Sequence, residues 1–449
     1  MNKTVVIDIV GLSKSLIGPH TPFLEKYTRE KSLTIIEPML PAVTTSVQST
    51  YVTGKWPSDH GIVGNGWYDH VDSEIKFWKQ SNKLVLAEKI WEKAKRENPA
   101  FTCSNMFWWY NMYLTADYSV TPRPNYLADG RKMPDCYSHP ADLRDYLQHE
   151  LGTFPLFQFW GPGANIKSTR WIADASILTD RKYDPTLTLI YLPNLDYCLQ
   201  KFGYDLQKIS PELGEVDKVV EGLVTYYQKK NARIILLSEY GITTVDRPIH
   251  LNRILREHDL LAIRVERGLE LLDAGASKAF AVADHQVAHI YISDPGMIGK
   301  VKSLIEQVPG VDLVMDREAQ KKQHLSHERA GDLVVVADQQ SWFTYYFWMD
   351  DAKAPDYARV VDIHRKPGYD PVEMFMTSKL RAGYKLLRKK AALRYVMDVI
   401  PLDASLVKGS HGRAGNDPSF YPVLVTDQPV NLQVKPTDVY HIIWSHLFG

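Results

Sequence analysis

The sequence predicts an α/β protein with a central, mostly parallel sheet sandwiched between helices. Short apolar, β-branched runs recur along the chain, and apolar residues at helical spacing lie between them. This alternation is typical of a parallel sheet covered by helices on both faces. A chain of 449 residues is long for a single core, so we also expect an inserted cap.

Four runs are the best candidate strands, and we expect all four to be buried and parallel. They are 4–12 (TVVIDIVGL), 186–196 (TLTLIYLPNLD), 232–242 (ARIILLSEYGI) and 331–338 (GDLVVVAD). Helical stripes lie between them, at Leu84, Ile90, Trp91 and Ala94 and at Val219, Val220, Leu223, Val224 and Tyr227. The basic segment 378–400 is expected to be a helix whose Leu, Tyr and Val side chains contact the core beneath a solvated face.

The pattern of strands and helices breaks twice along the chain. Residues 101–179 combine aromatic clusters with Pro and Gly turns, so we expect them to form the inserted cap. The core then comprises 1–100 and 180–449. A second irregular insertion lies within it at about 250–365.

Composition argues against nucleic-acid and membrane partners. The chain has 53 basic and 53 acidic residues, whereas nucleic acids and anionic membranes attract an excess of positive charge. No apolar run approaches the roughly 18 residues of a membrane span, and the apolar start of the chain resembles a strand more than a secretory signal. The three cysteines have no metal-ligand spacing. We therefore expect a cytoplasmic protein, whose oligomeric state the sequence does not reveal.

The stretch 41–54 (PAVTTSVQSTYVTG) clusters hydroxyl side chains where a helix could begin. A hydroxyl nucleophile works best at a helix N-terminus, because the backbone N–H groups there favour an anionic phosphoryl group. Ser and Thr are also frequent helix N-caps. Spacing alone therefore leaves the catalytic and the structural interpretations open.

Four motifs resemble the alkaline phosphatase superfamily, in its nucleotide pyrophosphatase/phosphodiesterase and phosphonoacetate hydrolase branch. The stretch 41–54, continued by GKWPSDHGIVGN to 65 and by EKIWEKA at 88–94, resembles the nucleophile segment. The others are YLPNLDYCLQKFG at 191–203, IILLSEYGI at 234–242 and KGSHGRAGND at 408–417. The resemblance implies the fold of that superfamily, Thr44 as the attacking residue, and a centre of two divalent ions.

The same resemblance implies a set of metal ligands that this sequence only partly keeps. The positions are Asp8, Thr44, Glu239 and Tyr240 at one ion, and Asp196, Gln200 and His411 at the other. Gln200 and Tyr240 stand where the family has histidines, and Val10 stands where it has an aspartate, so that Asp8 lies one pleat upstream. Fewer imidazoles favour manganese or magnesium over zinc, or an empty position. We expect at most one tightly held ion.

Other side chains can replace the missing ligands, although each can also be structural. The candidates are Asp284, His285, His289, His324, His327, Asp362 and His364. His364 is the preferred substitute, because HRKPGYD and GSHGR both lie late in the chain. Val47 replaces the asparagine with which family members hold a phosphate oxygen.

Substrate contacts are expected near the nucleophile segment and in the aromatic cluster that follows it. Asn65 lies in the family's register. Trp108, Trp109 and Tyr110 could stack on a flat group or pack the cap. Arg123 lies in a loop with Arg131 and Lys132 that could meet a second phosphate or remain solvated.

Two function classes follow from the resemblance. In the first, a metal-dependent hydrolase cleaves phosphodiesters or pyrophosphates: Thr44, deprotonated by a metal, attacks phosphorus and forms a phosphothreonine that water then hydrolyses. A phosphonate hydrolase would share this mechanism. In the second, a binding protein keeps the fold and has lost the two-metal centre. Retention of Thr44, Asp196 and His411 favours the enzyme, and the altered metal positions favour the binding protein.

Overall fold

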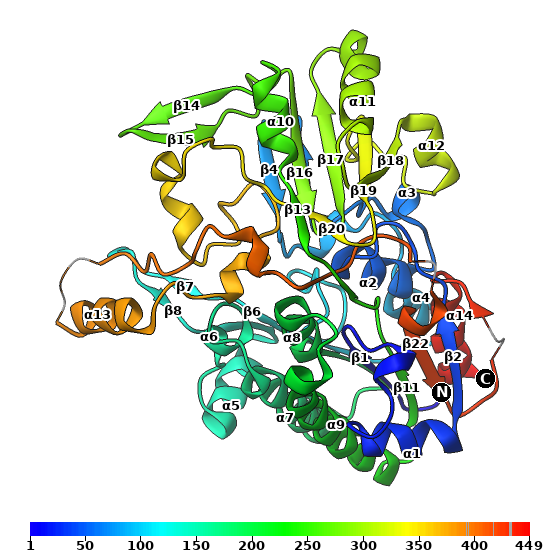
Figure 1. The fold of residues 1–449 in the computed structure, drawn as a ribbon. Coiled ribbons are helices and arrows are strands. Elements are labelled where there is room, and N and C mark those ends of the chain that lie inside the picture. Colours follow the sequence, from blue (N-terminus) through cyan, green and yellow to red (C-terminus); the bar gives the residue numbers. More distant parts are fainter. Residues whose placement is uncertain (392, 394, 416, 431–432) are drawn as a thin grey trace.

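The computed structural model describes residues 1–391, 393, 395–415, 417–430 and 433–449. It confirms the predicted α/β class, because a nine-stranded, mostly parallel sheet lies between helices (Figure 1). The strands, in spatial order, are β23 (Gln433–Val434), β2 (Ser32–Ile36), β22 (Val423–Thr426), β11 (Arg233–Leu237), β1 (Thr4–Ile9), β10 (Leu187–Leu192), β5 (Cys103–Met106), β6 (Tyr118–Pro122) and β9 (Cys136–His139). The three central strands β11, β1 and β10 run parallel.

Helices cover both faces of this sheet (Figure 1). One layer consists of α1 (Pro22–Glu30), α5 (Ala141–Leu151), α6 (Leu156–Phe159), α7 (Ile166–Tyr183), α8 (Asn194–Phe202) and α9 (Leu206–Lys229). The other consists of α2 (Thr44–Thr53), α3 (Pro57–His60), α4 (Ile90–Glu97) and α14 (Asp438–Phe448). Every residue of β1 and β10 is buried, which explains their continuous apolar sequence.

A second hydrophobic cluster surrounds a separate antiparallel sheet. Its strands are β16 (Ala279–Asp284), β17 (Val287–Ile292), β19 (Leu333–Ala337) and β18 (Val311–Met315), and its helices are α10 (Leu251–Glu257), α11 (Ile298–Glu306) and α12 (Arg317–Lys322). The prediction that 331–338 is a parallel strand is therefore wrong, since β19 pairs antiparallel with both neighbours. An apolar run reports burial on both faces and not the direction of adjacent strands.

The segment 101–179, which we expected to be an inserted cap, contributes β5, β6 and β9 to the central sheet. Its aromatic and proline-rich sequence does not show the alternation typical of strands, although β5 and most of β6 are buried. The irregular region at about 250–365 instead carries most of the second cluster. Leu84, expected in a helix with Ile90, lies in a 3-10 turn before α4.

Five small two-stranded sheets connect these layers. They are β3 (Gly66–Asp69) with β4 (Glu74–Phe77), β7 (Asn125–Tyr126) with β8 (Lys132–Met133), β12 (Thr243–Thr244) with β21 (Gly409–Ser410), β13 (Arg247–Ile249) with β20 (Ser341–Phe343), and β14 (Ile263–Glu266) with β15 (Leu269–Leu272).

The basic helix α13 (Lys379–Lys390) projects from the body of the molecule (Figure 1). None of its twelve residues is buried, so the expected core contacts of its Leu and Tyr side chains are absent. Within the described ranges, no helix combines the length and the apolar character that crossing a bilayer requires.

Candidate active site

A cavity of about 1400 Å³ brings together residues from both hydrophobic clusters. Thr44, Asp196 and Tyr240 line it from the central sheet, where β10 and β11 lead into α8 and the following loop. His285 lines it from the turn after β16. Ligand sites of open α/β sheets lie at the carboxyl ends of the strands, as this one does.

The N-terminus of α2 places Thr44 in the cavity wall. The helix begins at Thr44, directly after an extended Val43, and all ten of its residues are buried. The Thr44 hydroxyl lies 3.0 Å from the Tyr240 hydroxyl. Tyr51 donates a hydrogen bond of 2.9 Å to the Ser238 carbonyl, which ties α2 to the end of β11. The partial positive charge of the helix N-terminus is thereby held at the cavity.

An acidic pair, Asp8 and Glu239, lies next to this hydroxyl and shares one amide donor. Gln48 Nε2 donates to Asp8 Oδ2 at 3.3 Å and to Glu239 Oε1 at 2.6 Å. Gln48 Oε1 in turn accepts from the backbone N–H of Trp109 at 2.6 Å, which fixes the amide orientation. Asp8 Oδ1 and Glu239 Oε2 have no hydrogen-bond partner in the described part of the chain.

Burial disfavours ionisation of this acidic pair. Desolvation raises the pKa of Asp8 to about 7, opposed by its hydrogen bonds to Glu239 and Gln48. Desolvation, and then the nearby Asp8 charge, raise the pKa of Glu239 well above its usual value. Two carboxyls this close share a proton near neutral pH. The nearby Thr44 hydroxyl lowers the pKa of Glu239, against the effect of burial.

Asp196 and Gln200 lie one helical turn apart on α8, so their side chains meet. Gln200 Nε2 donates to Asp196 Oδ2 at 2.8 Å, and Tyr369 donates its hydroxyl to Gln200 Oε1 at 2.9 Å. Both ends of the amide are therefore engaged. Desolvation raises the pKa of Asp196 to about 7, and the Glu239 charge contributes in the same direction.

Four aromatic rings lie in a row as two stacked pairs, with a tilt of 37° where the pairs meet, and all but His411 line the cavity. Tyr240 lies on His411 with ring centroids 3.6 Å apart, His411 on His285 at 3.8 Å, and His285 on Tyr369 at 3.6 Å. The next residue, Gly412, has φ +118°, a conformation that L side chains rarely adopt. This turn lets the His411 carbonyl accept from the Gln286 N–H, which joins the late segment to the second cluster.

His411 and Asp196 face each other with two hydrogen-bond acceptors, the ring nitrogen Nε2 and the carboxylate oxygen Oδ1. His411 Nδ1 lies 2.7 Å from the Ala42 carbonyl oxygen, so this nitrogen carries the hydrogen and Nε2 does not. Nε2 lies 3.6 Å from Asp196 Oδ1. Desolvation, and then His285, lower the pKa of His411 well below its usual value, so the contact is not an ion pair. Neither atom has a hydrogen-bond partner among the described residues.

Asp196 and His411 offer two ligands to a divalent ion, and the described residues do not form the two-ion centre that the resemblance implies. A cation between Asp196 Oδ1 and His411 Nε2 would satisfy two buried, unpartnered acceptors. At the other position, the Gln48 amide already stands between Asp8 and Glu239 as a neutral donor. Within the described ranges, no three or more His, Cys, Asp or Glu side chains are grouped as a metal site.

His364, the preferred substitute ligand, lines the same cavity but contacts the Phe77 carbonyl through Nδ1 at 3.4 Å. His285, not His364, packs against His411. The remaining candidates have structural contacts: Asp284 accepts from the Asn65 side chain, His289 contacts the Val63 carbonyl, His324 stacks on Trp56, His327 accepts from the Arg329 N–H, and Asp362 pairs with Arg365.

The expected substrate contacts divide between the cavity and the protein interior. Trp109 lines the cavity. Trp108 is buried in the first hydrophobic cluster and Tyr110 in the second, so these two pack the core. Asn65 accepts from the Thr45 N–H and donates to Asp284, which joins α2 to β16. Arg123 is exposed and donates to Gln80, a residue of the cavity wall.

Sequence motifs did not single out Gln48, Tyr369 or the stacking of His285. Gln48 directly follows Val47, the position where the family has its phosphate-binding asparagine. This amide, one residue later, was the sequence feature that could have identified Gln48 as a site residue. Tyr369 reaches the site only because the second cluster packs over α8.

Comparison with known proteins finds relatives at low sequence identity. Over 387 residues the chain is 26% identical to ectonucleotide pyrophosphatase/phosphodiesterase 2 of Saccharomyces cerevisiae, covering 80% of this chain and 68% of that protein. It is 24% identical to ectonucleotide pyrophosphatase/phosphodiesterase 1 of the same yeast, where the match covers 67% of this chain and 39% of the relative.

Two solved structures have the same fold at low sequence identity. Inactive murine ectonucleotide pyrophosphatase/phosphodiesterase 5 in complex with AMP is 14% identical, with a TM-score of 0.60 over 100% of this chain and 95% of the other. Phosphonoacetate hydrolase from Sinorhizobium meliloti 1021, in complex with phosphonoformate, is 14% identical, with a TM-score of 0.62 over 99% and 96%. Since residues 4–370 also match the family model, the chain belongs to the type I phosphodiesterase/nucleotide pyrophosphatase family.

Proposed function

We propose that this protein hydrolyses phosphodiester or pyrophosphate bonds of small molecules, with Thr44 as the nucleophile. The observation that carries the proposal is the position of the Thr44 hydroxyl. It stands at the first residue of a buried helix, in a cavity wall, 3.0 Å from the Tyr240 hydroxyl and near Glu239. Family membership supports the reaction class, and AMP and phosphonoformate in the related structures support a small phosphate-like ligand.

In the proposed reaction, Glu239 accepts the Thr44 proton as the hydroxyl oxygen attacks phosphorus. The acidic pair holds one proton near neutral pH, so Glu239 acts as the base when that proton resides on Asp8. Its raised pKa then makes its carboxylate a stronger base than an exposed glutamate. The new bond joins Thr44 Oγ1 to phosphorus, and the leaving oxygen departs with its electron pair and takes a proton from water. Tyr240, whose pKa burial raises well above its usual value, stays neutral and donates to Thr44 Oγ1. Water then cleaves the phosphothreonine and regenerates Thr44.

Asp196 and His411 would hold a single divalent ion, of manganese, magnesium or zinc. Such an ion would supply positive charge to the phosphoryl oxygens of the substrate. Gln200 and Tyr369 orient Asp196, and the Ala42 carbonyl orients His411.

Two alternatives remain. A phosphonate hydrolase would use the same nucleophile, and the phosphonoacetate hydrolase neighbour supports it. A binding protein without catalysis is favoured by the Gln48 amide between Asp8 and Glu239, since this amide occupies the region where family members bind a second ion.

Substitution of Thr44 separates these possibilities. Thr44→Ala removes the nucleophile and should lower turnover of bis(p-nitrophenyl) phosphate roughly a thousandfold or more. The loss of its contact with Tyr240 should cost only about 1 kcal/mol of unfolding free energy. Thr44→Ser keeps a hydroxyl and should retain measurable turnover.

Ser46→Ala is the matched control, because Ser46 lies on the same buried helix and its hydroxyl has no hydrogen-bond partner among the described residues. It should leave both turnover and stability nearly unchanged. Equal, partial losses in Thr44→Ala and Ser46→Ala would show that the hydroxyl cluster only stabilises α2. A wild-type protein that binds phosphodiesters and phosphonates without cleaving either would favour the binding protein.

A further inference from the structure

Helix α13 exposes a stripe of large apolar side chains. Leu380, Tyr384 and Leu387 follow one another at intervals of four and three residues, so they lie on one face of the helix. Their exposed fractions are 86%, 55% and 66%. Single exposed apolar residues are ordinary, but an aligned exposed stripe usually marks an interaction surface.

Basic side chains border this stripe on both sides. The helix has six basic and no acidic residues in KLRAGYKLLRKK. At 3.6 residues per turn, Lys379 and Lys390 lie along one edge of the stripe. Along the other edge lie Arg381, which pairs with Asp398, and Arg388, which donates to the Tyr384 hydroxyl. Long cationic side chains beside an apolar face can reach outward to anionic groups while their stems remain in apolar surroundings.

The other face of α13 belongs to the wall of the cavity that contains Thr44. Ala382, Leu386 and Lys389 line this cavity. Additional exposed apolar residues line it from neighbouring segments: Tyr126, Phe157, Met376 and Leu393. The exposed apolar residues therefore gather around the cavity mouth, where α13 and the β7–β8 hairpin lie at the same end of the molecule (Figure 1).

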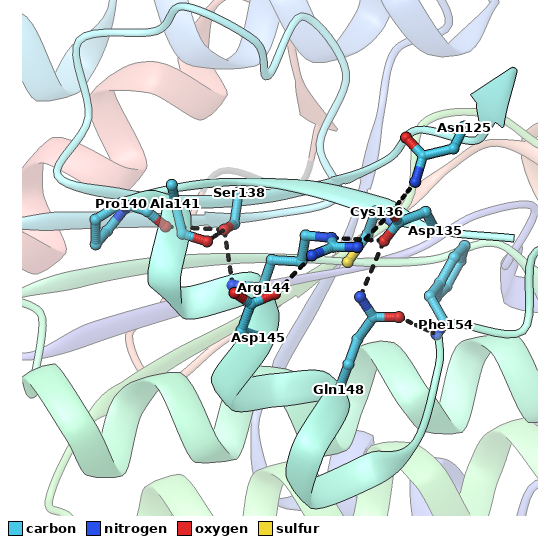
Figure 2. A network of polar contacts seen from close by, with 10 residues as sticks. All are labelled: Asn125, Asp135, Cys136, Ser138, Pro140, Ala141, Arg144, Asp145, Gln148 and Phe154. Atoms are coloured by element: carbon cyan, nitrogen blue, oxygen red, sulfur yellow. Dashed lines mark hydrogen bonds and ion pairs between the residues drawn. The ribbon is translucent and has the colours of Figure 1, made fainter. Parts of the chain in front are cut away.

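This side of the mouth is held in place by a polar network (Figure 2). The carboxylate of Asp135, just after β8, accepts from Arg144 Nε at 2.7 Å and Nη2 at 2.6 Å and from Gln148 Nε2 at 2.9 Å, both residues of α5. Asn125 of β7 donates to the same carboxylate. The hairpin that carries Tyr126 is thus anchored to the helical layer.

We propose that α13 docks this protein on an anionic lipid surface. Leu380, Tyr384 and Leu387 would enter the acyl boundary, and Lys379 and Lys390 beside them would meet lipid phosphates, as in interfacial amphipathic helices. The balanced net charge of the chain predicted no membrane partner, but it conceals this local concentration of positive charge. A second copy of the chain fits the stripe less well, because it would bring two such basic helices together.

Docking of this kind would bring the cavity, whose wall α13 forms with its other face, next to the bilayer. The apolar residues around that mouth would then accept the hydrocarbon tail of a phosphoric ester, while the phosphoryl group reaches Thr44. This second step rests on the proposed hydrolase function, whereas the docking itself does not.

Vesicle binding tests the docking without catalysis. The full chain carrying Thr44→Ala is sedimented with vesicles of phosphatidylcholine alone and with vesicles that also contain phosphatidylglycerol. We expect binding to the anionic vesicles only, weakened by added salt. Leu380→Ser with Leu387→Ser should reduce that binding by about tenfold or more. Val265→Ser with Leu313→Ser removes two other exposed apolar side chains and should leave binding unchanged.

Three results would overturn the docking: no binding to anionic vesicles, equal binding by the α13 double variant, or a dimer in light scattering that the double variant abolishes. Hydrolysis is measured separately with methyl and dodecyl p-nitrophenyl phosphate, the latter presented in anionic vesicles. The α13 double variant should lose turnover of the dodecyl ester and keep that of the methyl ester. If vesicles bind but neither ester is cleaved, the docking stands and the proposed hydrolase function fails.

Discussion

Gln48 donates its amide to both Asp8 and Glu239, where the family resemblance implies a metal ion. An amide supplies hydrogen-bond donors without a positive charge, so it leaves the charge of the acidic pair uncompensated. The pair therefore retains a proton at pH values where exposed carboxyls have lost theirs. This single residue links the local sequence PAVTTSVQ to the ionisation of the site.

The raised pKa of Asp8 predicts a specific dependence of stability on pH. Between pH 3.8 and about 7 the folded protein keeps the Asp8 proton while the unfolded chain has lost it. This contribution is fully present below pH 3.8 and is lost as the pH rises through the folded-state pKa. Asp8→Asn removes the cost of burying the charge. It should raise the unfolding free energy by about 2 to 4 kcal/mol at pH 8 and change it little at pH 4.

Urea unfolding at pH 4, 6 and 8 measures this effect. Asp59→Asn, at an exposed carboxyl of α3, is the control and should show no comparable gain at pH 8. A stabilisation by Asp8→Asn that is the same at all three pH values would contradict the raised pKa.

At the scale of elements, the central strands and the start of α2 were predictable, because local sequence patterns indicate both. β1, β10 and β11 are continuous apolar runs. The direction of β19 was not predictable, since the same kind of run occurs in antiparallel sheets that are covered on both faces. The exposure of α13 was hidden as well, because periodicity identifies an apolar face but not what covers it.

The turn after β21 shows how backbone geometry places the His411 ring. Gly412 has φ +118°, and a Cβ there would lie 3.1 Å from the Gln286 backbone nitrogen. The backbone strain of a positive φ should by itself lower the stability of Gly412→Ala by about 1 to 2 kcal/mol. The close contact of the new Cβ with Gln286 should also displace His411. Gly415→Ala is the matched control, because a Cβ at Gly415 meets nothing within 4 Å.

Thermal unfolding and phosphodiesterase rate, measured for both glycine variants, test this role. We expect Gly412→Ala to lose rate and melting temperature together. An unchanged rate in a destabilised Gly412→Ala protein would mean that the turn matters for folding but does not set the position of His411.

Across the whole molecule, the site forms where two hydrophobic clusters meet. Thr44, Asp196, Glu239 and His411 could be brought together from motifs alone, because three of them follow strands of one sheet and the fourth has a strong sequence motif. His285 and Tyr369 could not, because they reach the site only through packing of the second cluster on the first. Their positions depend on contacts between segments that are distant in sequence and follow no local pattern.

The unpartnered acceptors at the junction of the two clusters also predict how many ions the molecule binds. Asp196 and His411 leave two acceptors unpartnered 3.6 Å apart, whereas Gln48 satisfies the acidic pair in part. Titration of chelator-treated protein with Mn²⁺ should therefore give at most one ion per chain.

Since the ion binds only the folded protein, an Mn²⁺ concentration of 100 times Kd should raise the unfolding free energy by about 2.7 kcal/mol. Asp196→Asn should abolish that gain, and Asp174→Asn, at an exposed carboxyl on α7, should preserve it. Two ions per chain would show that Asp8 and Glu239 bind a cation with Gln48 displaced, and the Gln48→Ala variant would then bind the second ion more tightly.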